Sequence, residues 1–143
     1  AYNLVNRGFE IGLSEVAMHE QVGLLAYSPL AQGTLTGKYL GGQMPQGSRL
    51  ALFGDGPLMM RYKGDKTQQA IEMYVNLAKK YEIDPAQLAI QFCNIQPFVT
   101  STIIGATTME QLKTCIDSVD LDITKEIINE IRSIHKEIPN PAP

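Results

Sequence analysis

The sequence predicts an α/β fold with parallel strands, because stretches typical of β-strands alternate along the chain with stretches typical of helices. Residues 2–5 and 22–27 are short, continuous apolar runs of the kind that buried parallel strands show, and residues 98–104 are rich in β-branched and aromatic side chains. Right-handed crossovers between such strands leave two arrangements, a doubly wound sheet or part of a β/α barrel. Three strands cannot close a barrel, so a barrel would be incomplete.

Helices are predicted between these strands. The first covers residues 14–21, and apolar residues at helical spacing predict another over residues 70–81. The next helix opens at Asp84, which can cap it, with Pro85 in the first turn and Gln87 completing a capping-box pattern.

Two further helices follow the last strand. Thr107 and Thr108 can each cap the first of them, with Glu110 or Gln111 three residues on as the reciprocal partner. The second covers residues 124–138 and is stopped by prolines. The predicted buried stripes are Leu112, Ile116 and Val119 on the first helix, and Ile127, Ile131, Ile134 and Ile138 on the second.

The composition bounds the partners. The net charge is -3 and no broad basic region is present, which argues against nucleic acid and anionic membranes. No apolar stretch reaches the roughly 20 residues of a membrane span, and the first residues have no signal-peptide pattern, so a cytoplasmic location is expected. The chain begins directly in an apolar run, which suggests a start in the middle of a fold. Its cysteines and histidines have no metal-ligand spacing, and packing or solvated roles are expected for them.

Residues 28–64 form a long predicted loop rich in glycine and proline, and loops of that length are usually functional or disordered. Its first part follows the end of a strand. The Tyr27 ring can lie against a planar heterocycle, Ser28 can bond phosphate oxygens, and Gly33 allows close backbone approach. Lys38 and Arg49 add the positive charge that a pyrophosphate requires. The alternative is a polar turn with a structural tyrosine.

A second candidate segment follows residues 98–104. Gly105, Thr107 and Thr108 lie at a predicted strand-to-helix turn, where unpaired N–H groups and the helix dipole favour an anion. Simple helix capping by the threonines is the alternative.

Three stretches, YSPLAQGTLTGKY, the arginine of GSRLALF, and STIIGATTMEQLKTCI, resemble the signatures of the aldo-keto reductase family that follow barrel strands seven and eight. The resemblance covers the whole chain and is nearest to the bacterial Tas-like branch. It implies that residues 1–143 are the C-terminal part of a (β/α)8 TIM barrel, about strands 6–8 and their helices. Loop 28–64 would cover the cofactor, and helix 124–138 would end the domain.

The resemblance also implies NADP(H) as the cofactor. Tyr27 matches the aromatic residue that stacks on the nicotinamide, and Cys115 stands where the family usually has an asparagine that reaches the adenine. The segment that embraces the pyrophosphate is matched by Ser28, Pro29, Leu30, Gln32, Lys38 and Arg49, with Gly33 among them, and the adenosine and 2′-phosphate end by Gly105, Thr107 and Gln111.

The family's reaction is reduction of an aldehyde or ketone by hydride transfer, with small-molecule carbonyl compounds as substrates. Its catalytic tyrosine, aspartate, lysine and histidine come from the first half of the barrel, so none is assigned here. The chain is therefore expected to be the cofactor-binding half of a reductase and inactive alone, with a missing N-terminal half or a second copy as its partner. A cofactor-sensing regulatory module and an inert, self-associating half-barrel are the alternatives, since the fold also serves as a potassium-channel subunit.

Overall fold

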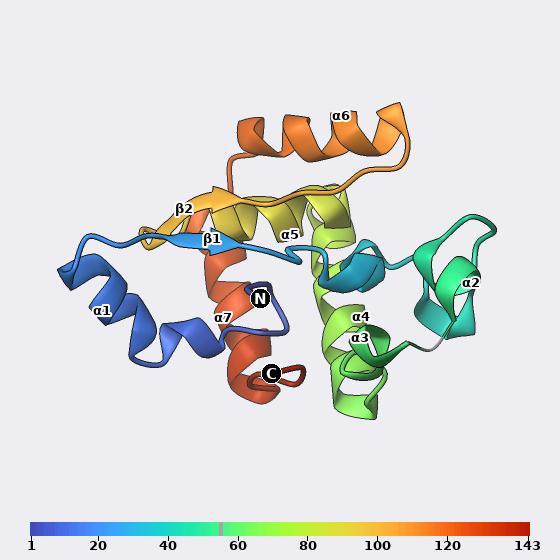
Figure 1. The fold of residues 1–143 in the computed structure, drawn as a ribbon, viewed down its shortest axis with the longest axis horizontal. Helices are drawn as coiled ribbons and strands as arrows, with labels where there is room; N and C mark the ends of the chain where they lie inside the picture. The colour runs from blue at the N-terminus through green and yellow to red at the C-terminus, as the bar shows by residue number, and fades with distance from the viewer. Residues whose placement is uncertain (55) are drawn as a thin grey trace.

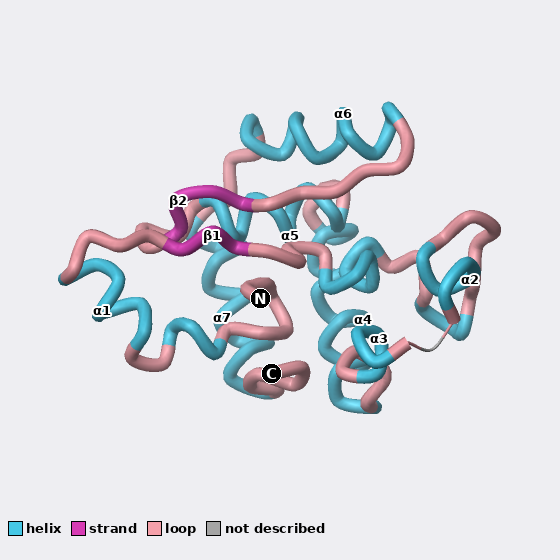
Figure 2. The backbone as a smooth tube through the Cα atoms, in the orientation of Figure 1, coloured by secondary structure: helices cyan, strands magenta, loops and turns pink. Residues whose placement is uncertain are grey.

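A computed structural model describes residues 1–54 and 56–143 and places two parallel strands at its centre (Figures 1 and 2). Strand β1 (Leu24–Ala26) pairs with β2 (Val99–Thr102). The ladder continues at both ends, because Leu24 N–H donates to Phe98 O at 2.8 Å and Ile103 N–H donates to Ala26 O at 2.7 Å. The predicted parallel pairing of these two segments is therefore confirmed.

Residues 2–5 do not form the predicted strand. Asn3 and Asn6 instead exchange backbone hydrogen bonds of 3.0 and 3.1 Å within one tight turn. A single backbone bond, from Tyr2 N–H to Tyr27 O at 3.2 Å, joins this turn to the end of β1. The apolar run is buried as expected, but burial alone does not distinguish a strand from a buried turn. The Asn3 side chain stabilises the turn, because its oxygen accepts hydrogen bonds from two backbone N–H groups of the turn.

The helices account for most of the remaining chain. The long predicted loop is not structureless, because four short helical segments lie within it; Asp55, also in that loop, is outside the described residues. The helices are η1 (Gly8–Glu10), α1 (Leu13–His19), η2 (Ala31–Thr36), η3 (Leu40–Gly42), α2 (Arg49–Phe53), α3 (Pro57–Met60), α4 (Asp65–Lys80), α5 (Pro85–Asn94), α6 (Met109–Asp117), η4 (Ser118–Asp120) and α7 (Lys125–Glu137).

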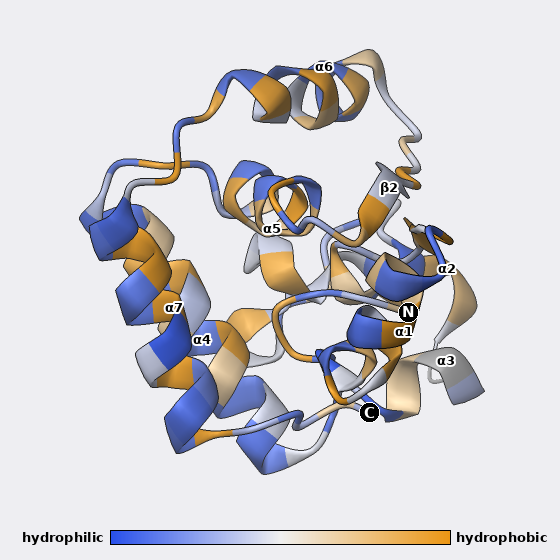
Figure 3. Cartoon of the chain, turned by 90° about the vertical axis from the view of Figure 1, so that its left-hand side faces the viewer, coloured by the Kyte–Doolittle hydropathy of each residue, from blue (hydrophilic) through white to orange (hydrophobic). Residues whose placement is uncertain are grey.

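Helix α5 lies at the centre of the packing, in contact with β2, α4 and α6, while α7 packs against α4 (Figure 1). Apolar faces of α4 and α7 turn inward and polar faces turn outward (Figure 3). The Tyr2 ring stacks on Phe92 of α5 at 5.7 Å and meets Phe98 edge-on at 5.3 Å, so the N-terminal turn is anchored in this core. The short helix η2 rests on α4 and α5, which places the start of the long loop on a rigid base.

Capping explains where the helices begin. The Asp84 carboxylate accepts from two N–H groups in the first turn of α5, at 2.8 and 3.2 Å, and Thr124 accepts from Ile127 N–H at 3.4 Å to start α7. The capping box predicted for α5 is not formed in the described structure, where Gln87 Nε2 instead donates to Thr114 O at 3.4 Å. An interhelical bond to α6 has replaced the local one.

The predicted buried stripe of α6 is wrong in part. Ile116 and Val119 are 56% and 63% exposed, while Cys115 and Ser118 are buried against α5. Ser118 Oγ donates to Cys115 O at 2.6 Å in the turn that ends the helix. This bond keeps the buried face, which carries Cys115 and Ser118, against α5. Both cysteines of the chain are free and buried, as predicted. Among the described residues, no helix is long and apolar enough to cross a membrane.

Candidate functional site

Both predicted ligand-binding segments begin where a parallel strand ends. Tyr27 follows the last residue of β1, and Gly105 comes shortly after the last residue of β2. Because the strands are parallel, the two segments leave the sheet at the same edge (Figure 2). In parallel α/β folds, ligands bind at the carboxyl ends of the strands.

The backbone after β1 adopts an unusual conformation. Ser28, Ala31 and Gln32 have φ angles of 56°, 49° and 60°, and they are three of the six non-glycine residues with positive φ in the described chain. Gly33 continues the left-handed run at 89°. Each such non-glycine residue costs on the order of 1 kcal/mol, and clusters of them mark segments whose shape matters more than local stability.

Hydrogen bonds from the N-terminal turn hold this segment in place. Asn3 Nδ2 donates to Ser28 O at 3.0 Å, and Ala31 N–H donates to the same oxygen at 2.9 Å. The neighbouring carbonyl, that of Tyr27, accepts from Tyr2 N–H. The bend after β1 is therefore held by bonds from the N-terminal turn and by a bond within the bend itself.

The side chains after β1 divide into exposed and buried ones. The Tyr27 ring is 53% exposed and can stack on a planar ligand. Pro29 is buried and Leu30 is half-buried, so their predicted contribution is through packing and backbone. Gln32 Nε2 donates to Ser28 Oγ at 3.4 Å, which brings two predicted phosphate-binding side chains together.

The two predicted cations are linked through Tyr39, which the sequence analysis did not identify. Lys38 Nζ lies over the Tyr39 ring, 5.1 Å from its centre, and the Tyr39 hydroxyl accepts from Leu50 N–H at 3.4 Å. Leu50 follows the exposed Arg49 at the start of α2. Lys38 also approaches Gly33 closely, since a Cβ on that glycine would lie 3.1 Å from Lys38 Nζ.

The turn after β2 is a capped helix start with exposed polar groups. Gln111 N–H donates to Thr108 Oγ1 at 3.2 Å, so Thr108 is the cap of α6. Gln111 Oε1 accepts from Thr107 N–H at 3.0 Å and from Thr107 Oγ1 at 3.1 Å. The reciprocal bond therefore goes to Thr107 and not to the cap itself. Gly105, Thr107 and Gln111 are all exposed and accessible to a ligand.

Among the predicted residues, hydrogen bonds join Ser28 with Gln32, Leu30 with Gly33, and Thr107 with Gln111, and the end of the Lys38 side chain lies close to Gly33. Each of these contacts lies within one segment, and none of them joins the loop after β1 to the turn after β2. Both segments leave the same edge of the sheet (Figure 2).

A partly buried ion pair supports the N-terminal turn. Arg7 binds Glu10 through two bonds, Nε to Oε1 at 2.7 Å and Nη2 to Oε2 at 2.8 Å, and the Tyr2 hydroxyl donates to Glu10 Oε1 at 2.6 Å. Burial acts to raise the pKa of Glu10, but the bonds from Arg7 and Tyr2 outweigh it and hold that pKa below its usual value. Burial and Glu10 together raise the pKa of Tyr2, which makes it a weaker acid.

The chain matches the family model described as aldo/keto reductase over residues 1–136. The chain belongs to the aldo/keto reductase family. Protein tas of Escherichia coli K12 is 50% identical over 142 residues, which cover 99% of this chain and 40% of that protein. A probable voltage-gated potassium channel subunit beta of rice, Oryza sativa subsp. japonica, is 35% identical over 120 residues, 82% of this chain and 37% of that protein.

Among solved structures, a glycerol dehydrogenase of Gluconobacter oxydans superposes with a TM-score of 0.73 at 22% identity, over 97% of this chain and 42% of that one. This likeness confirms the predicted fold class, part of the (β/α)8 barrel of the aldo/keto reductases. The chain spans about 40% of the length of the curated relatives it matches.

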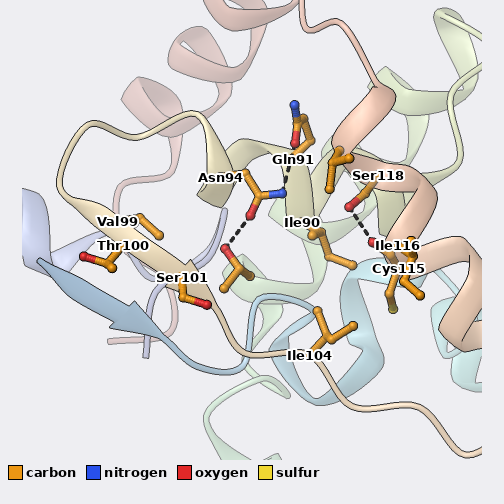
Figure 4. Close-up of a pocket in the computed structure, with 12 residues that line it drawn as sticks. Ile90, Gln91, Asn94, Val99, Thr100, Ser101, Ile104, Cys115, Ile116 and Ser118 are labelled. Carbon is orange, nitrogen blue, oxygen red and sulfur yellow. Dashed lines mark hydrogen bonds between the residues drawn. The ribbon is translucent and has the colours of Figure 1, made fainter.

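The aldo/keto reductase chain also has a pocket of about 580 Å³ between α5, β2 and α6 (Figure 4). Its wall combines apolar residues, such as Ile90 and Ile116, with a polar pair in which Thr102 Oγ1 donates to Asn94 Oδ1 at 2.6 Å. None of the predicted cofactor residues lines this pocket, although Cys115 does. Within the described part of the chain, no three His, Cys, Asp or Glu side chains gather as metal ligands would.

Sequence reasoning missed Asn3 and Tyr62. Tyr62 is buried, burial raises its pKa, and hydrogen bonds that involve Asn3 and Arg61 partly offset that rise. The available signal was the pair of asparagines three residues apart, at positions 3 and 6, since asparagine favours turns in which its side chain bonds the backbone. An apolar run surrounds both residues and obscured that signal.

Proposed function

We propose that residues 1–143 form the NADP(H)-binding part of an aldo/keto reductase that reduces aldehydes or ketones to alcohols. The observation that carries this proposal is the segment from Ser28 to Gly33 at the carboxyl end of β1, in which four of the six residues have positive φ angles, with the exposed Tyr27 before it. Two cations follow within the same loop, Lys38 and Arg49. Family membership supplies the reaction class, and this segment supports the nucleotide as its ligand.

The residues fit a dinucleotide in three parts. Tyr27 would stack against the nicotinamide, as its exposed ring permits. The strained backbone, with Ser28 and Gln32, and the two cations would hold the pyrophosphate, because Lys and Arg form charge-assisted bonds to phosphate oxygens. Exposed N–H groups and hydroxyls at the start of α6, from Gly105 to Gln111, would take the 2′-phosphate, which favours NADP over NAD.

Glycine at position 33 serves this fit. A side chain there would press on Lys38 from 3.1 Å and would fill space at the face of the segment. The absence of a Cβ leaves Lys38 free to approach the backbone, so that ammonium and N–H groups can act on one phosphate group. Residues 28–64 would then cover the bound cofactor.

When bound, the cofactor supplies a hydride for the carbonyl carbon, and the residues of this chain bind and orient it. The alkoxide that forms needs a proton. Tyr2 and Tyr74 are poor donors, because burial raises the pKa of both above the usual value for tyrosine. We therefore expect the proton donor to lie in the rest of the barrel and the 143-residue chain alone to lack reductase activity.

The experiment is a pair of assays on purified chain of verified intact mass. NADPH binding is followed by isothermal calorimetry, and NADPH consumption is followed at 340 nm with a panel of aldehydes and ketones. Saturable binding without turnover supports the proposal. Turnover by the verified chain, or a lack of any saturable binding, contradicts it.

A second candidate is a regulatory or interaction module. Val22, Leu25 and Ile103 are more than half exposed on or beside the strands, as are Ile116 and Val119 near α6. Apolar surface of this extent favours a protein partner, either the rest of the barrel or a second copy. The similarity to a plant potassium channel subunit fits a module that binds the cofactor without turnover. Sedimentation with and without NADPH separates these cases, because a regulatory module changes its assembly when the nucleotide binds.

A further inference from the structure

Asn3 is a fully buried residue whose side chain is bonded at both ends. Its Oδ1 accepts from Val5 N–H at 3.0 Å and from Asn6 N–H at 2.9 Å, and its Nδ2 donates to Ser28 O at 3.0 Å. Its exposed fraction is 0%, so it cannot touch a ligand from the surface. Because the two backbone N–H groups can only donate, the atom that faces them is the oxygen, and the NH2 group faces Ser28.

Two consecutive residues hold two consecutive carbonyls. Tyr2 N–H donates to Tyr27 O, and Asn3 Nδ2 donates to Ser28 O. The first bond fixes the residue whose ring is exposed, and the second fixes the residue at which the backbone turns left-handed. The Ser28 carbonyl also receives Ala31 N–H, so one oxygen connects the N-terminal turn with the strained run that follows.

The other neighbours of Asn3 make this arrangement rigid. The Tyr2 ring is packed between Phe92 and Phe98, and its hydroxyl is bonded to Glu10. Tyr62, which comes from the end of the long loop, is also buried, and a hydrogen bond that involves Asn3 acts to lower its pKa. The N-terminal turn is thus anchored in the core. Through its bond to Ser28 O, Asn3 holds the segment after β1 in its observed conformation.

We propose that Asn3 is a positioning residue for the nucleotide site, which holds Ser28 left-handed and so presets Tyr27 and the phosphate-binding backbone before the cofactor binds. The expected effect on cofactor affinity rests on the proposed function. The bond from Asn3 to Ser28 is observed independently of it. A binding segment that is already ordered loses less conformational entropy on binding, and therefore binds more tightly. Without the bond, the intrinsic preference of serine for negative φ would open the turn.

The test compares the same chemical change at two neighbouring asparagines. Asn3→Asp keeps an oxygen for Val5 and Asn6 but replaces the donor to Ser28 with a second acceptor. Asn6→Asp is the matched control, since Asn6 is also buried, lies in the same turn and has its Oδ1 bonded only locally, to Gly8 N–H at 3.4 Å. Asn3→Ser serves as a second variant without added charge, because its hydroxyl can accept in the turn but is too short to reach Ser28.

Two measurements are made on each protein. Amide hydrogen exchange at Ala31 reports the turn directly, with Leu24 N–H in the sheet as the reference for overall stability. Calorimetry with NADPH reports the site. We expect both Asn3 variants to exchange at Ala31 about fivefold faster or more relative to Leu24, and to bind NADPH about fivefold more weakly, while Asn6→Asp changes each by less than about twofold.

Each outcome decides the matter. Equal acceleration at Ala31 and Leu24 in the Asn3 variants would mean a general stabilising role and would overturn the proposal, as would unchanged exchange at Ala31. Faster exchange at Ala31 with unchanged NADPH affinity would overturn the claim that Asn3 presets the nucleotide site. If the unaltered chain binds no NADPH, the proposed function fails, and exchange at Ala31 then decides whether Asn3 holds the turn. If Asn3→Asp does not fold, Asn3→Ser gives the answer by the same criteria.

Discussion

The ammonium group of Lys38 lies over the face of the Tyr39 ring, 5.1 Å from its centre. A cation held over an aromatic ring loses rotamer freedom before any ligand binds. The same ring is tied through its hydroxyl to the backbone next to Arg49. A buried tyrosine therefore holds Lys38 through its ring and the backbone next to Arg49 through its hydroxyl.

The first prediction concerns Lys38→Ala and Arg49→Ala. Each change removes a charge-assisted bond to phosphate, and such bonds contribute about 1.5–3 kcal/mol, so NADPH should bind on the order of tenfold more weakly or worse. Cys115→Ala is the control, since this buried side chain on α6 offers no charge and little surface. Calorimetric titrations rank the three variants. A larger loss in Cys115→Ala than in the two charge variants contradicts the assignment of the phosphate site.

The second prediction separates backbone strain from the position of Lys38. Gly33→Ala and Gly41→Ala both place a Cβ at positive φ, 89° and 68°, and each should lower the free energy of unfolding by about 1 kcal/mol. Only the Cβ at position 33 meets Lys38, at 3.1 Å, because nothing lies within 4 Å of that at position 41. Urea unfolding should give similar losses, whereas only Gly33→Ala should weaken NADPH binding. Equal effects of the two variants on NADPH binding would mean that the position of Lys38 does not determine affinity.

The third prediction is a pH dependence of stability that depends on Glu10. The pKa of this carboxyl is lower in the folded chain than its usual value, so its contribution to stability is complete above that usual value and is lost as the pH falls through the folded value. His135 acts in the same direction, because burial and Arg7 lower its pKa and protonation on acidification opposes folding.

Glu10→Gln should therefore lower the free energy of unfolding by about 2 kcal/mol at pH 7 and flatten its decline between about pH 5 and 3. Asp117→Asn is the control, because its ion pair with Lys113 is solvent-exposed and surface pairs contribute little. Urea unfolding across pH provides the measurement. A Glu10→Gln protein with the same acid dependence as the unaltered chain would show that the Arg7–Glu10 pair is not the cause.

The fourth prediction concerns the thiols. Burial raises the pKa of Cys93 to about 12, and burial together with Asp84 raises the pKa of Cys115, so neither is a ready thiolate at neutral pH. Iodoacetamide at pH 7.5 should leave both unmodified in the native chain and modify both in urea, as read by mass spectrometry. Rapid modification of Cys115 under native conditions would mean that α6 separates from α5 in solution.

The sequence predicted the fold well where periodicity and burial agree. Helix α7, with its capping Thr124, matches the expected range within one residue at each end, whereas α4, with a full apolar face, ends within one residue of expectation but begins five residues earlier. The paired strands were predicted from β-branched and apolar runs. Helices and strands of this kind depend on local propensity and on one buried face, both of which can be read from a single sequence. The choice of a barrel over a doubly wound sheet rested instead on the resemblance to the aldo-keto reductase signatures.

The remaining features depend on contacts between distant segments. Residues 2–5 are as apolar as a strand, but the Asn3 side chain closes a turn and then bonds Ser28, 25 residues away. On α6, the spacing of Ile116 and Val119 favoured their burial, but the helix turns Cys115 and Ser118 toward α5. Tyr39 was missed because its function depends on Leu50, a contact that composition and spacing do not encode.

The most direct test of the central claim is a calorimetric titration of the mass-verified 143-residue chain with NADPH and, in parallel, with NADH. The account predicts saturable, one-to-one binding of NADPH that is at least about tenfold tighter than that of NADH, because the start of α6 would bind the 2′-phosphate. Equal affinity for the two nucleotides would remove the turn after β2 from the site. The absence of binding to either would contradict the assignment of this chain as the nucleotide-binding part of the reductase.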